Sequence, residues 1–371
     1  MAIEMSGHWI HELEILGGPY NFPNESTGSE FNGHFERFSA LLIDSSEFKE
    51  ISEKIFKLKA ERNAVILAHN YQRDEVQEVA DYTGDSLELS RIAAGTDYSV
   101  IVFAGVHFMA ESASILSPGK TVLLTEAEAG CPMAEMVTVS GPRFYSTHFP
   151  GAGKEFCYTY PEDFSLRDIK AKYPGIPVVS YVNTTASVKA ESDICCTSAN
   201  VVKVVESLDS RRVICVPDKN LAAWAAKNTG KEIIAWDGFC NIHDRVTIQD
   251  VMAARAECPN ALLIAHPECP MEVLEKADFV TSTSGMLRFC RESGAKEFII
   301  GTELGLMYRL RKDSPGKSFY PLRKDMLCPN MKKTTIKSVL RTLEHMDCVV
   351  KVPEDIRIPA KRALDRMLEI K

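Results

Sequence analysis

One pattern occurs three times along the chain, and an internal repeat restricts the possible folds more strongly than any single motif. Each copy begins with a short apolar run that ends in polar side chains, at residues 64–71, 177–183 and 261–268. Runs rich in β-branched residues and closed by polar ones are typical of buried parallel strands with a site at their C-terminal ends. The repeat therefore predicts three related α/β units.

The spacing after each run is also repeated. The first polar residue lies 17 residues before a hydroxyl residue, and an aspartate precedes that hydroxyl by five residues. The segments between have a helical composition that returns the chain to a second strand, so we expect the hydroxyls at helix N-caps. The three sets are His69, Asp81 and Ser86; Tyr181, Asp193 and Ser198; and His266, Asp278 and Thr283.

The second half of each copy leads to a cysteine. A further apolar run and a helical segment close at a Gly-Lys pair, and Cys131, Cys240 and Cys328 follow these lysines by 11, 9 and 11 residues. Taken singly, a free cysteine is usually a small buried hydrophobic residue. Three equivalent loops can meet on a pseudo-threefold axis, however, and there the three thiolates would surround one point.

Three thiolates without a fourth ligand indicate a catalytic metal centre rather than a structural one. Thiolate is a soft ligand suited to zinc or to iron–sulfur clusters. A structural zinc site normally has four ligands, often with Cys-x2-Cys pairing, whereas these cysteines are unpaired and 109 and 88 residues apart. The separations favour a site between domains with one coordination position open.

The polar pairs at the strand ends are candidates for ligand binding. In α/β sheets such positions face the ligand crevice, although a single strand-end His or Tyr commonly only caps backbone groups. Ser198 and Thr283, at helix starts, are suited to an anion. We therefore expect a small substrate with phosphate and carboxylate groups. The pairs are His69 with Tyr71, Tyr181 with Asn183, and His266 with Glu268.

Composition excludes several classes of protein. A net charge of -8 and the lack of any dense Lys/Arg run argue against nucleic acid as a partner. No apolar stretch reaches 18 residues and the first 30 residues lack a signal-peptide pattern, so we expect a cytoplasmic protein without membrane contact. Eleven cysteines, an odd number, indicate thiols, metal ligands or redox groups rather than a disulfide framework.

The copies divide the chain into consecutive segments. We expect an amphipathic helix at 48–58, a polar insertion with a helix at 166–172 between the first two copies, and a last amphipathic helix from Pro359 onward. The predicted segments are an N-terminal extension (1–62), domain 1 (63–136), the insertion (137–175), domain 2 (176–258), domain 3 (259–345) and a C-terminal tail helix (346–371).

Eight short motifs together resemble the quinolinate synthase A family, over about residues 63–345. They are 68–72 (AHNYQ), 84–86 (GDS), 105–109 (GVHFM), 131–134 (CPMA), 181–184 (YVNT), 265–269 (AHPEC), 301–303 (GTE) and 328–332 (CPNMK). The resemblance implies an α/β fold of three homologous three-layer α/β/α domains with short parallel sheets around a pseudo-threefold axis. It also implies a central 4Fe-4S cluster on Cys131, Cys240 and Cys328, with one iron free of cysteine. The repeat agrees with this fold.

The resemblance further implies an activity. The chain would condense iminoaspartate with dihydroxyacetone phosphate to quinolinate, phosphate and water, a transferase-type step of de novo NAD biosynthesis, with iminoaspartate coming from an aspartate-oxidising enzyme. The open iron would act as a Lewis acid. Tyr71, Glu268, His69 and His266 are the implied catalytic residues, and Glu303 a further base or support. The implied substrate-binding residues are His69, Ser86, Tyr181, Asn183, Ser198, His266, Glu268 and Thr283.

Two other functions stay open on the sequence, as does the oligomeric state. An iron–sulfur hydro-lyase would use the same open iron to dehydrate a hydroxy acid. A non-catalytic sensor of phosphate or carboxylate would use cysteines to sense redox state. The remaining cysteines fit either a redox thiol pair or inert buried thiols. They include the adjacent Cys195 and Cys196, and Cys258, Cys269 and Cys290.

Overall fold

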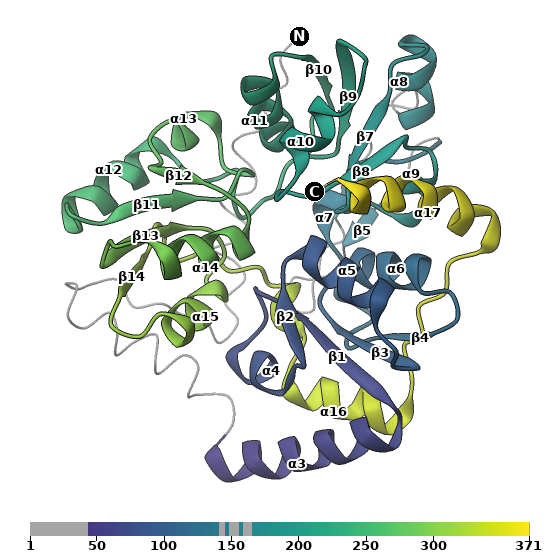
Figure 1. Cartoon of the computed structure of the whole chain (residues 1–371), viewed down its shortest axis with the longest axis vertical. Coiled ribbons are helices and arrows are strands. Elements are labelled where there is room, and N and C mark those ends of the chain that lie inside the picture. The colour runs from purple at the N-terminus through teal and green to yellow at the C-terminus, as the bar shows by residue number, and fades with distance from the viewer. Residues whose placement is uncertain (1–43, 141–144, 148–155, 159–164, 371) are drawn as a thin grey trace.

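The computed structural model describes residues 44–140, 145–147, 156–158 and 165–370. It contains three four-stranded parallel sheets with the same strand order, and Figure 1 shows them grouped around a common centre. The orders are β2-β1-β3-β4, β8-β7-β9-β10 and β12-β11-β13-β14. This arrangement confirms the predicted α/β class with three homologous units.

The strands of the three sheets have the following bounds. The first sheet contains β1 (Ala64–His69), β2 (Tyr82–Gly84), β3 (Val100–Ala104) and β4 (Thr121–Leu124). The second contains β7 (Val178–Tyr181), β8 (Ile194–Cys196), β9 (Arg212–Val216) and β10 (Glu232–Ala235). The third contains β11 (Leu262–Ala265), β12 (Phe279–Val280), β13 (Glu297–Gly301) and β14 (Ser318–Pro321).

Helices cover and connect the sheets. Those of the first unit are α3 (Ser45–Glu61), α4 (Asp74–Val79), α5 (Ser86–Gly95), α6 (His107–Leu116) and α7 (Pro132–Glu135). The next are α8 (Leu166–Lys172), α9 (Ala186–Ala190), α10 (Val201–Glu206), α11 (Lys219–Thr229) and α12 (Ile248–Glu257). The last are α13 (Met271–Leu274), α14 (Thr283–Glu292), α15 (Leu306–Asp313), the 3-10 turn η1 (Met331–Lys333), α16 (Ile336–His345) and α17 (Glu354–Glu369).

Both faces of the first sheet are buried, which makes this unit three layers deep. Successive residues of β1 alternate between two hydrophobic cores. Val65 and Leu67 belong to the core that includes side chains of α5 and α6, whereas Ile66 and Ala68 belong to the core that includes side chains of α3 and α16. A strand that is covered on both faces consists of consecutive apolar residues, which explains why apolar and polar residues do not alternate in the sequence of β1.

The repeated aspartates and lysines stabilise the three units in the same way. The carboxylate of each aspartate accepts the backbone N–H of a residue in the first strand of its unit. The lysines of the Gly-Lys pairs, Lys120, Lys231 and Lys317, donate to the carbonyl groups of Thr96, Glu206 and Ser293 at the ends of α5, α10 and α14. These repeated residues therefore belong to the scaffold. The aspartate pairs are Asp81 with Ile66 at 2.8 Å, Asp193 with Val178 at 2.7 Å and Asp278 with Leu263 at 2.8 Å.

The prediction that Ser86, Ser198 and Thr283 are helix N-caps is wrong. The residue before the hydroxyl caps two of the helices: Asp85 accepts two N–H groups in the first turn of α5, and Ser282 accepts one in α14. Helix α10 begins only at Val201, so Ser198 lies in the preceding turn. A carboxylate or hydroxyl one residue earlier already satisfies the free amide groups. None of the three predicted hydroxyls is therefore used as a cap.

Two terminal helices lie across the units. Helix α3 is longer than predicted and packs with α16 against the first sheet. Helix α17 begins at Glu354, so the prediction of a start at Pro359 was wrong. The first turn carries Glu354 and Asp355, whose negative charges interact favourably with the helix dipole and stabilise a start one and a half turns earlier. Ala363 and Leu364 of α17 join the core that the first and second units share. Figure 1 shows α17 running past α9 and α6 of these two units.

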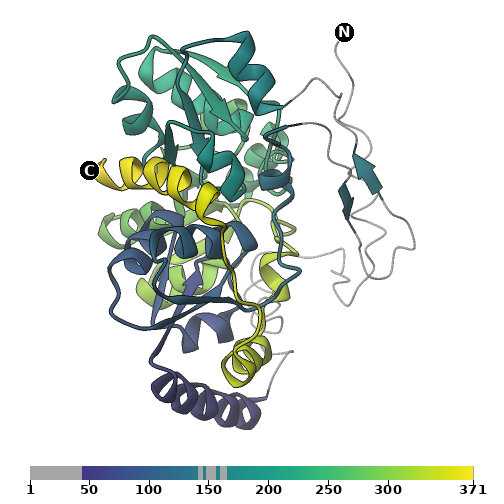
Figure 2. The same ribbon diagram turned by 90° about the vertical axis from the view of Figure 1, so that its right-hand side faces the viewer.

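The insertion contains helix α8 at the predicted position. It also contains an antiparallel strand pair, β5 (Tyr145–Thr147) and β6 (Phe156–Tyr158), which the sequence did not predict and which Figure 2 shows apart from the three sheets. The rest of 141–164, and residues 1–43 of the N-terminal extension, lie outside the described residues. The domain boundaries stay a prediction.

In the described part of the chain, no helix is both long enough and apolar enough to cross a membrane.

Candidate active site

The three repeated cysteines occupy equivalent loops that follow β4, β10 and β14. One backbone hydrogen bond recurs in all three loops. Its donor is the third residue after β3, β9 or β13, and its acceptor is the carbonyl two residues before the cysteine. The bonds run from His107 N–H to Ala129, from Lys219 N–H to Gly238 and from Leu304 N–H to Met326, each at 2.8 Å. The same local structure therefore presents each thiol, as the repeat predicts.

Two of the cysteine loops have a further support that the first loop lacks. Asp218 Oδ2 accepts the N–H of Cys240 at 3.1 Å, and Glu303 Oε1 accepts the N–H of Cys328 at 3.0 Å. The equivalent residue of the first unit is Val106, which has no acceptor. The buried carboxylate of Glu303 also accepts the N–H of Gly305 and pairs with the Lys332 ammonium. Its oxygens are thus occupied, which suits a support rather than a base.

All residues predicted for the site line one cavity between the three units. Its volume, including the opening to solvent, is about 740 Å³, which suits a small ligand. Thr302 and Lys332 lie just behind it. The predicted residues on its wall are His69, Tyr71, Ser86, Cys131, Tyr181, Asn183, Ser198, Cys240, His266, Glu268, Thr283 and Cys328, and Glu303 is there too.

The three cysteines are half-buried, and their thiols need a cation to become ligands. Burial raises the pKa of Cys328 to about 11 and raises those of Cys131 and Cys240 further. Each added thiolate would also repel the next, because Cys328 raises the pKa of Cys131, and Cys131 that of Cys240. Three thiolates in this cavity therefore require a positively charged partner.

The spacing of the sulfur atoms fits a cluster better than a single ion. The ligand atoms of one tetrahedral zinc lie within about 4 Å of one another. Within the described ranges, the one trio of such atoms that all lie within 4.8 Å of one another is Cys240, His243 and Glu268, so at least two of the three sulfurs stand further apart than that. Three thiols that line one cavity but are not close enough together for a single ion fit the implied iron–sulfur group.

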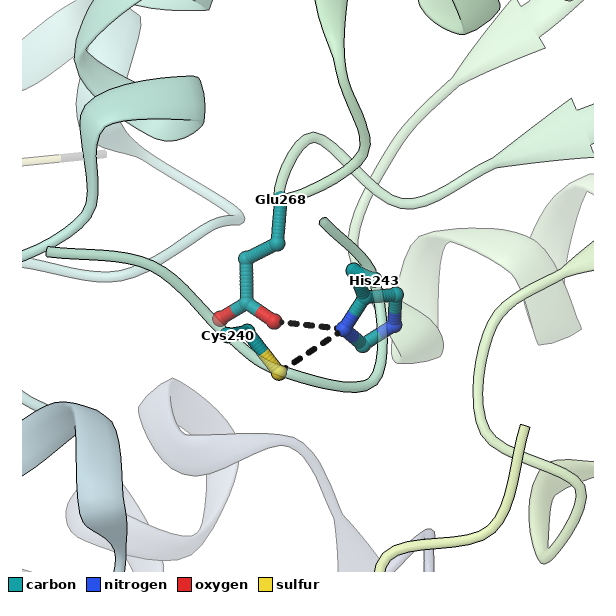
Figure 3. A group of neighbouring side chains, drawn as sticks. All are labelled: Cys240, His243 and Glu268. Carbon is teal, nitrogen blue, oxygen red and sulfur yellow. Dashed lines mark hydrogen bonds and ion pairs between the residues drawn. The ribbon is translucent and has the colours of Figure 1, made fainter. Parts of the chain in front are cut away.

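Sequence reasoning missed His243, which lies at the centre of the site. Its Nδ1 is 2.8 Å from Glu268 Oε2 and 3.2 Å from Cys240 Sγ, as Figure 3 shows. Its ring stacks on His266 with centroids 4.8 Å apart. The repeat has no equivalent histidine, since Ala134 and Met331 stand three residues after the other cysteines. The Cys-x2-His spacing, common among metal ligands, was the signal that was available.

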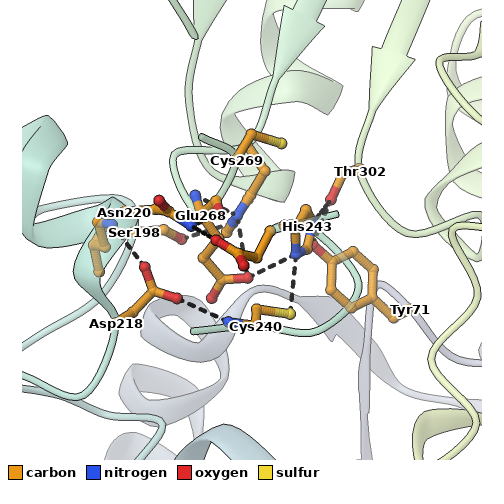
Figure 4. A network of polar contacts seen from close by, with 12 residues as sticks. Tyr71, Ser198, Asp218, Asn220, Cys240, His243, Glu268, Cys269 and Thr302 are labelled. Atoms are coloured by element: carbon orange, nitrogen blue, oxygen red, sulfur yellow. Dashed lines mark hydrogen bonds and ion pairs between the residues drawn. The ribbon is translucent and has the colours of Figure 1, made fainter. Parts of the chain in front are cut away.

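A hydrogen-bond network joins the strand ends of different units (Figure 4). The Tyr71 hydroxyl lies 2.6 Å from Thr302 Oγ1, which is 2.9 Å from His243 Nε2. His266 Nε2 lies 3.2 Å from Ser198 Oγ, and the Asn70 amide donates to Thr283 Oγ1 at 2.9 Å. The network therefore holds together residues that are far apart in the sequence.

Burial sets the charge of the site. Burial lowers the pKa of both His69 and His266 to about 3, so both rings are neutral at neutral pH. Burial also opposes ionisation of Glu268, but the neighbouring His266, His243 and Tyr181 outweigh it and hold its pKa at about 2. Burial raises the pKa of Tyr71 and that of Tyr181. Glu268 is thus a carboxylate anion beside the neutral rings of His69 and His266.

One polar atom on the wall has no protein partner. Asn183 Oδ1 is buried and accepts no hydrogen bond from the described residues. A buried acceptor without a donor costs about 1–3 kcal/mol, so such an atom commonly marks a place for ligand or water. Because Asn183 lies beside the cavity, this acceptor is available to a bound substrate.

The other cysteines that were candidates for a redox pair are free. Burial raises the pKa of Cys195 to about 11 and that of Cys290 to about 12, which makes both thiols unreactive. Cys196 and Cys269 are also fully buried and free, and Cys258 is partly buried and free.

The fold and this cavity define an enzyme in which three α/β units surround a buried site of three thiols and several acid–base groups. The sequence model of the quinolinate synthetase A protein family matches residues 53–369, so the chain belongs to that family, whose members act in NAD biosynthesis. It is 54% identical to the quinolinate synthase of Geotalea uraniireducens over 86% of this chain and 98% of the relative. It is 55% identical to that of Geobacter metallireducens and 53% to that of Thermodesulfovibrio yellowstonii, each over 86% of this chain and 97% of the relative.

The low pKa of the buried histidines predicts how stability depends on pH. An unfolded histidine takes up its proton near pH 6.5, whereas folded His69 stays neutral down to about pH 3. The unfolded state therefore binds more protons between these values, so the stability due to His69 is complete above pH 6.5 and declines below it, by about 1.4 kcal/mol per pH unit. The free energy of unfolding of the metal-free protein can be measured by urea denaturation between pH 4 and 7. His69→Gln should reduce its slope with pH below 6.5 by about 1.4 kcal/mol per pH unit.

The exposed His345 on α16 provides the matched control. We expect His345→Gln to leave the pH dependence as in the wild type. Equal slopes for His69→Gln and the wild type would show that His69 is protonated in the folded protein.

Proposed function

We propose that the chain condenses iminoaspartate with dihydroxyacetone phosphate to quinolinate, phosphate and water, with a 4Fe-4S cluster on Cys131, Cys240 and Cys328. The observation that carries this proposal is the convergence of three equivalent cysteine loops on one cavity. The relatives named quinolinate synthase support it over most of the chain. When bound, the cluster supplies at its cysteine-free iron a Lewis acid that polarises substrate oxygen atoms.

The wall of the cavity suits an anionic substrate with many oxygen atoms. Its described lining residues include no Lys or Arg, so carboxylate and phosphate groups would be held by neutral donors. The hydroxyls of Ser86, Ser198 and Thr283 supply such donors, and Ser86 and Thr283 are the first residues of helices α5 and α14. Asn183 Oδ1 offers an acceptor for an imine N–H or a substrate hydroxyl.

The protonation states indicate which groups move protons. Glu268 is ionised and therefore is the proton acceptor of the site, whereas the phenols of Tyr71 and Tyr181 keep their protons and act as donors. Isomerisation, ring closure and dehydration each need such transfers. The neutral rings of His69 and His266 would orient substrate carboxylates by hydrogen bonds.

The free cysteines also indicate a cell compartment that keeps thiols reduced. The ten cysteines whose side chains the structure describes are all free, and cytoplasmic reductants keep thiols in this state. We therefore place the enzyme in the cytoplasm, where an aspartate-oxidising enzyme would supply the unstable iminoaspartate.

The cluster assignment predicts metal content. Anaerobic purification or reconstitution of the chain should give a brown protein with about four iron and four sulfide per chain. Cys131→Ala should lose this cluster, because two thiols cannot replace three. Cys258→Ala, which changes a partly buried cysteine outside the cavity, should keep it. A colourless wild-type protein that takes up no iron and sulfide would contradict the assignment.

The role of Glu268 predicts a specific loss of activity. With iminoaspartate and dihydroxyacetone phosphate, the holoenzyme should form quinolinate, and Glu268→Gln should lower kcat by at least about 100-fold with the cluster retained. Glu272→Gln, on the exposed side of α13, is the matched control and should keep full activity. Dehydration of a hydroxy acid without quinolinate formation would favour a hydro-lyase, and binding without turnover would favour a sensor.

A further inference from the structure

A compact group of three metal-ligand side chains lies inside the cavity and shares only Cys240 with the set of three thiols. Cys240 Sγ, His243 Nδ1 and a carboxylate oxygen of Glu268 lie within 4.8 Å of one another. The side chains of His243 and Glu268 are 1% and 5% exposed, so the group is shielded from solvent. Figure 3 shows that the same ring nitrogen faces both the thiol and the carboxylate.

We propose that the chain, when it lacks a cluster, binds one Zn²⁺ ion through Cys240, His243 and Glu268. Thiolate, imidazole and carboxylate are the three ligand types that zinc uses in proteins. Ligand atoms of a tetrahedral zinc lie about 3.3 to 3.6 Å apart. His243 Nδ1 lies 3.2 Å from Cys240 Sγ and 2.8 Å from Glu268 Oε2. Side-chain movements that shift these ligand atoms by roughly half an ångström would bring both distances to that spacing.

The surroundings of His243 orient it as a metal ligand. Its Nε2 lies 2.9 Å from Thr302 Oγ1, so the ring can donate its N–H there and turn the Nδ1 lone pair toward the thiol and the carboxylate. Histidine ligands nearly always have such a partner on the second nitrogen. The Tyr71 hydroxyl, 2.6 Å from the same Thr302 oxygen, holds this partner in place.

The charge of the group also fits a divalent cation. A carboxylate at Glu268 and a thiolate at Cys240 would place two negative charges side by side, and the Glu268 side chain is only 5% exposed. Buried charges are stable when they are paired or coordinate a metal. The described lining contains no Lys or Arg that would neutralise them, so a dication would make the group neutral. The three protein ligands leave the fourth zinc position facing the cavity.

The zinc group shares only one residue with the cluster ligands. It uses Cys240 but neither Cys131 nor Cys328. If the proposed cluster is correct, zinc and cluster compete for Cys240, and a zinc-loaded chain assembles no cluster until the ion is removed. The site would thus make the unfilled enzyme sensitive to zinc.

Metal titration of the full chain tests this site. The protein is purified in air, stripped of metal with a chelator, reduced, and titrated with Zn²⁺ against a coloured chelator or with Co²⁺ alone. We expect one ion per chain and, for Co²⁺, a thiolate-to-metal absorption band. His243→Gln should weaken zinc binding by at least about 100-fold, and Thr302→Val by about 10- to 100-fold, because each removes a ligand or its support.

Cys131→Ala and Cys328→Ala are the decisive controls, because they remove cluster ligands and leave the zinc group whole. Both should bind zinc and give the cobalt band as the wild type does, and far-UV circular dichroism checks that every variant is folded. Zinc binding that disappears in either cysteine variant, or that is unchanged in His243→Gln, would overturn the proposal. A wild-type chain that binds zinc in this way but never takes up iron and sulfide would contradict the proposed function and still support the zinc site.

Discussion

Three half-buried thiols in one cavity impose the electrostatic constraint on which this structure depends. Burial keeps each thiol protonated, and every thiolate raises the cost of the next. Only a positively charged group among them makes three thiolates stable together. The scaffold brings the three thiols to one cavity by using the same loop structure three times. Each loop is closed by an equivalent 2.8 Å backbone hydrogen bond.

The chemistry of the cavity is asymmetric although the scaffold is repeated. The strand ends that are equivalent by the repeat carry His69, Tyr181 and His266, which differ in what they bind. Carboxylates hold the loops of Cys240 and Cys328, whereas Val106 takes that place in the first unit. Three homologous units can thus contribute one equivalent thiol each and still offer three different sets of polar groups to a substrate.

The sequence predicted what the repeat encodes. The positions of the first and middle strands, the three cysteine loops and the parallel sheets follow from spacings that occur three times, because each copy provides an independent view of the same local structure. The strand-end residues could be placed near one another because the C-terminal ends of parallel strands face one crevice.

The features that occur once could not be found in this way. His243 has no counterpart in the other units, and its partners Thr302 and Glu268 are separated from it by 59 and 25 residues. The N-caps were missed by one residue because Asp85 and Ser282 compete with the neighbouring hydroxyls for the same amide groups. The start of α17 was missed because Pro359 reads as a helix boundary, although the helix continues through it.

In the proposed holoenzyme, three cysteines, one from each unit, hold a single cluster whose remaining iron faces the substrate groups. A Mössbauer spectrum of ⁵⁷Fe-labelled holoenzyme, recorded with and without bound substrate, can detect this arrangement. We expect one iron in four to change its signal when substrate binds, because the other three are held by cysteine. Four irons that all keep their signals in the presence of bound substrate would contradict this arrangement.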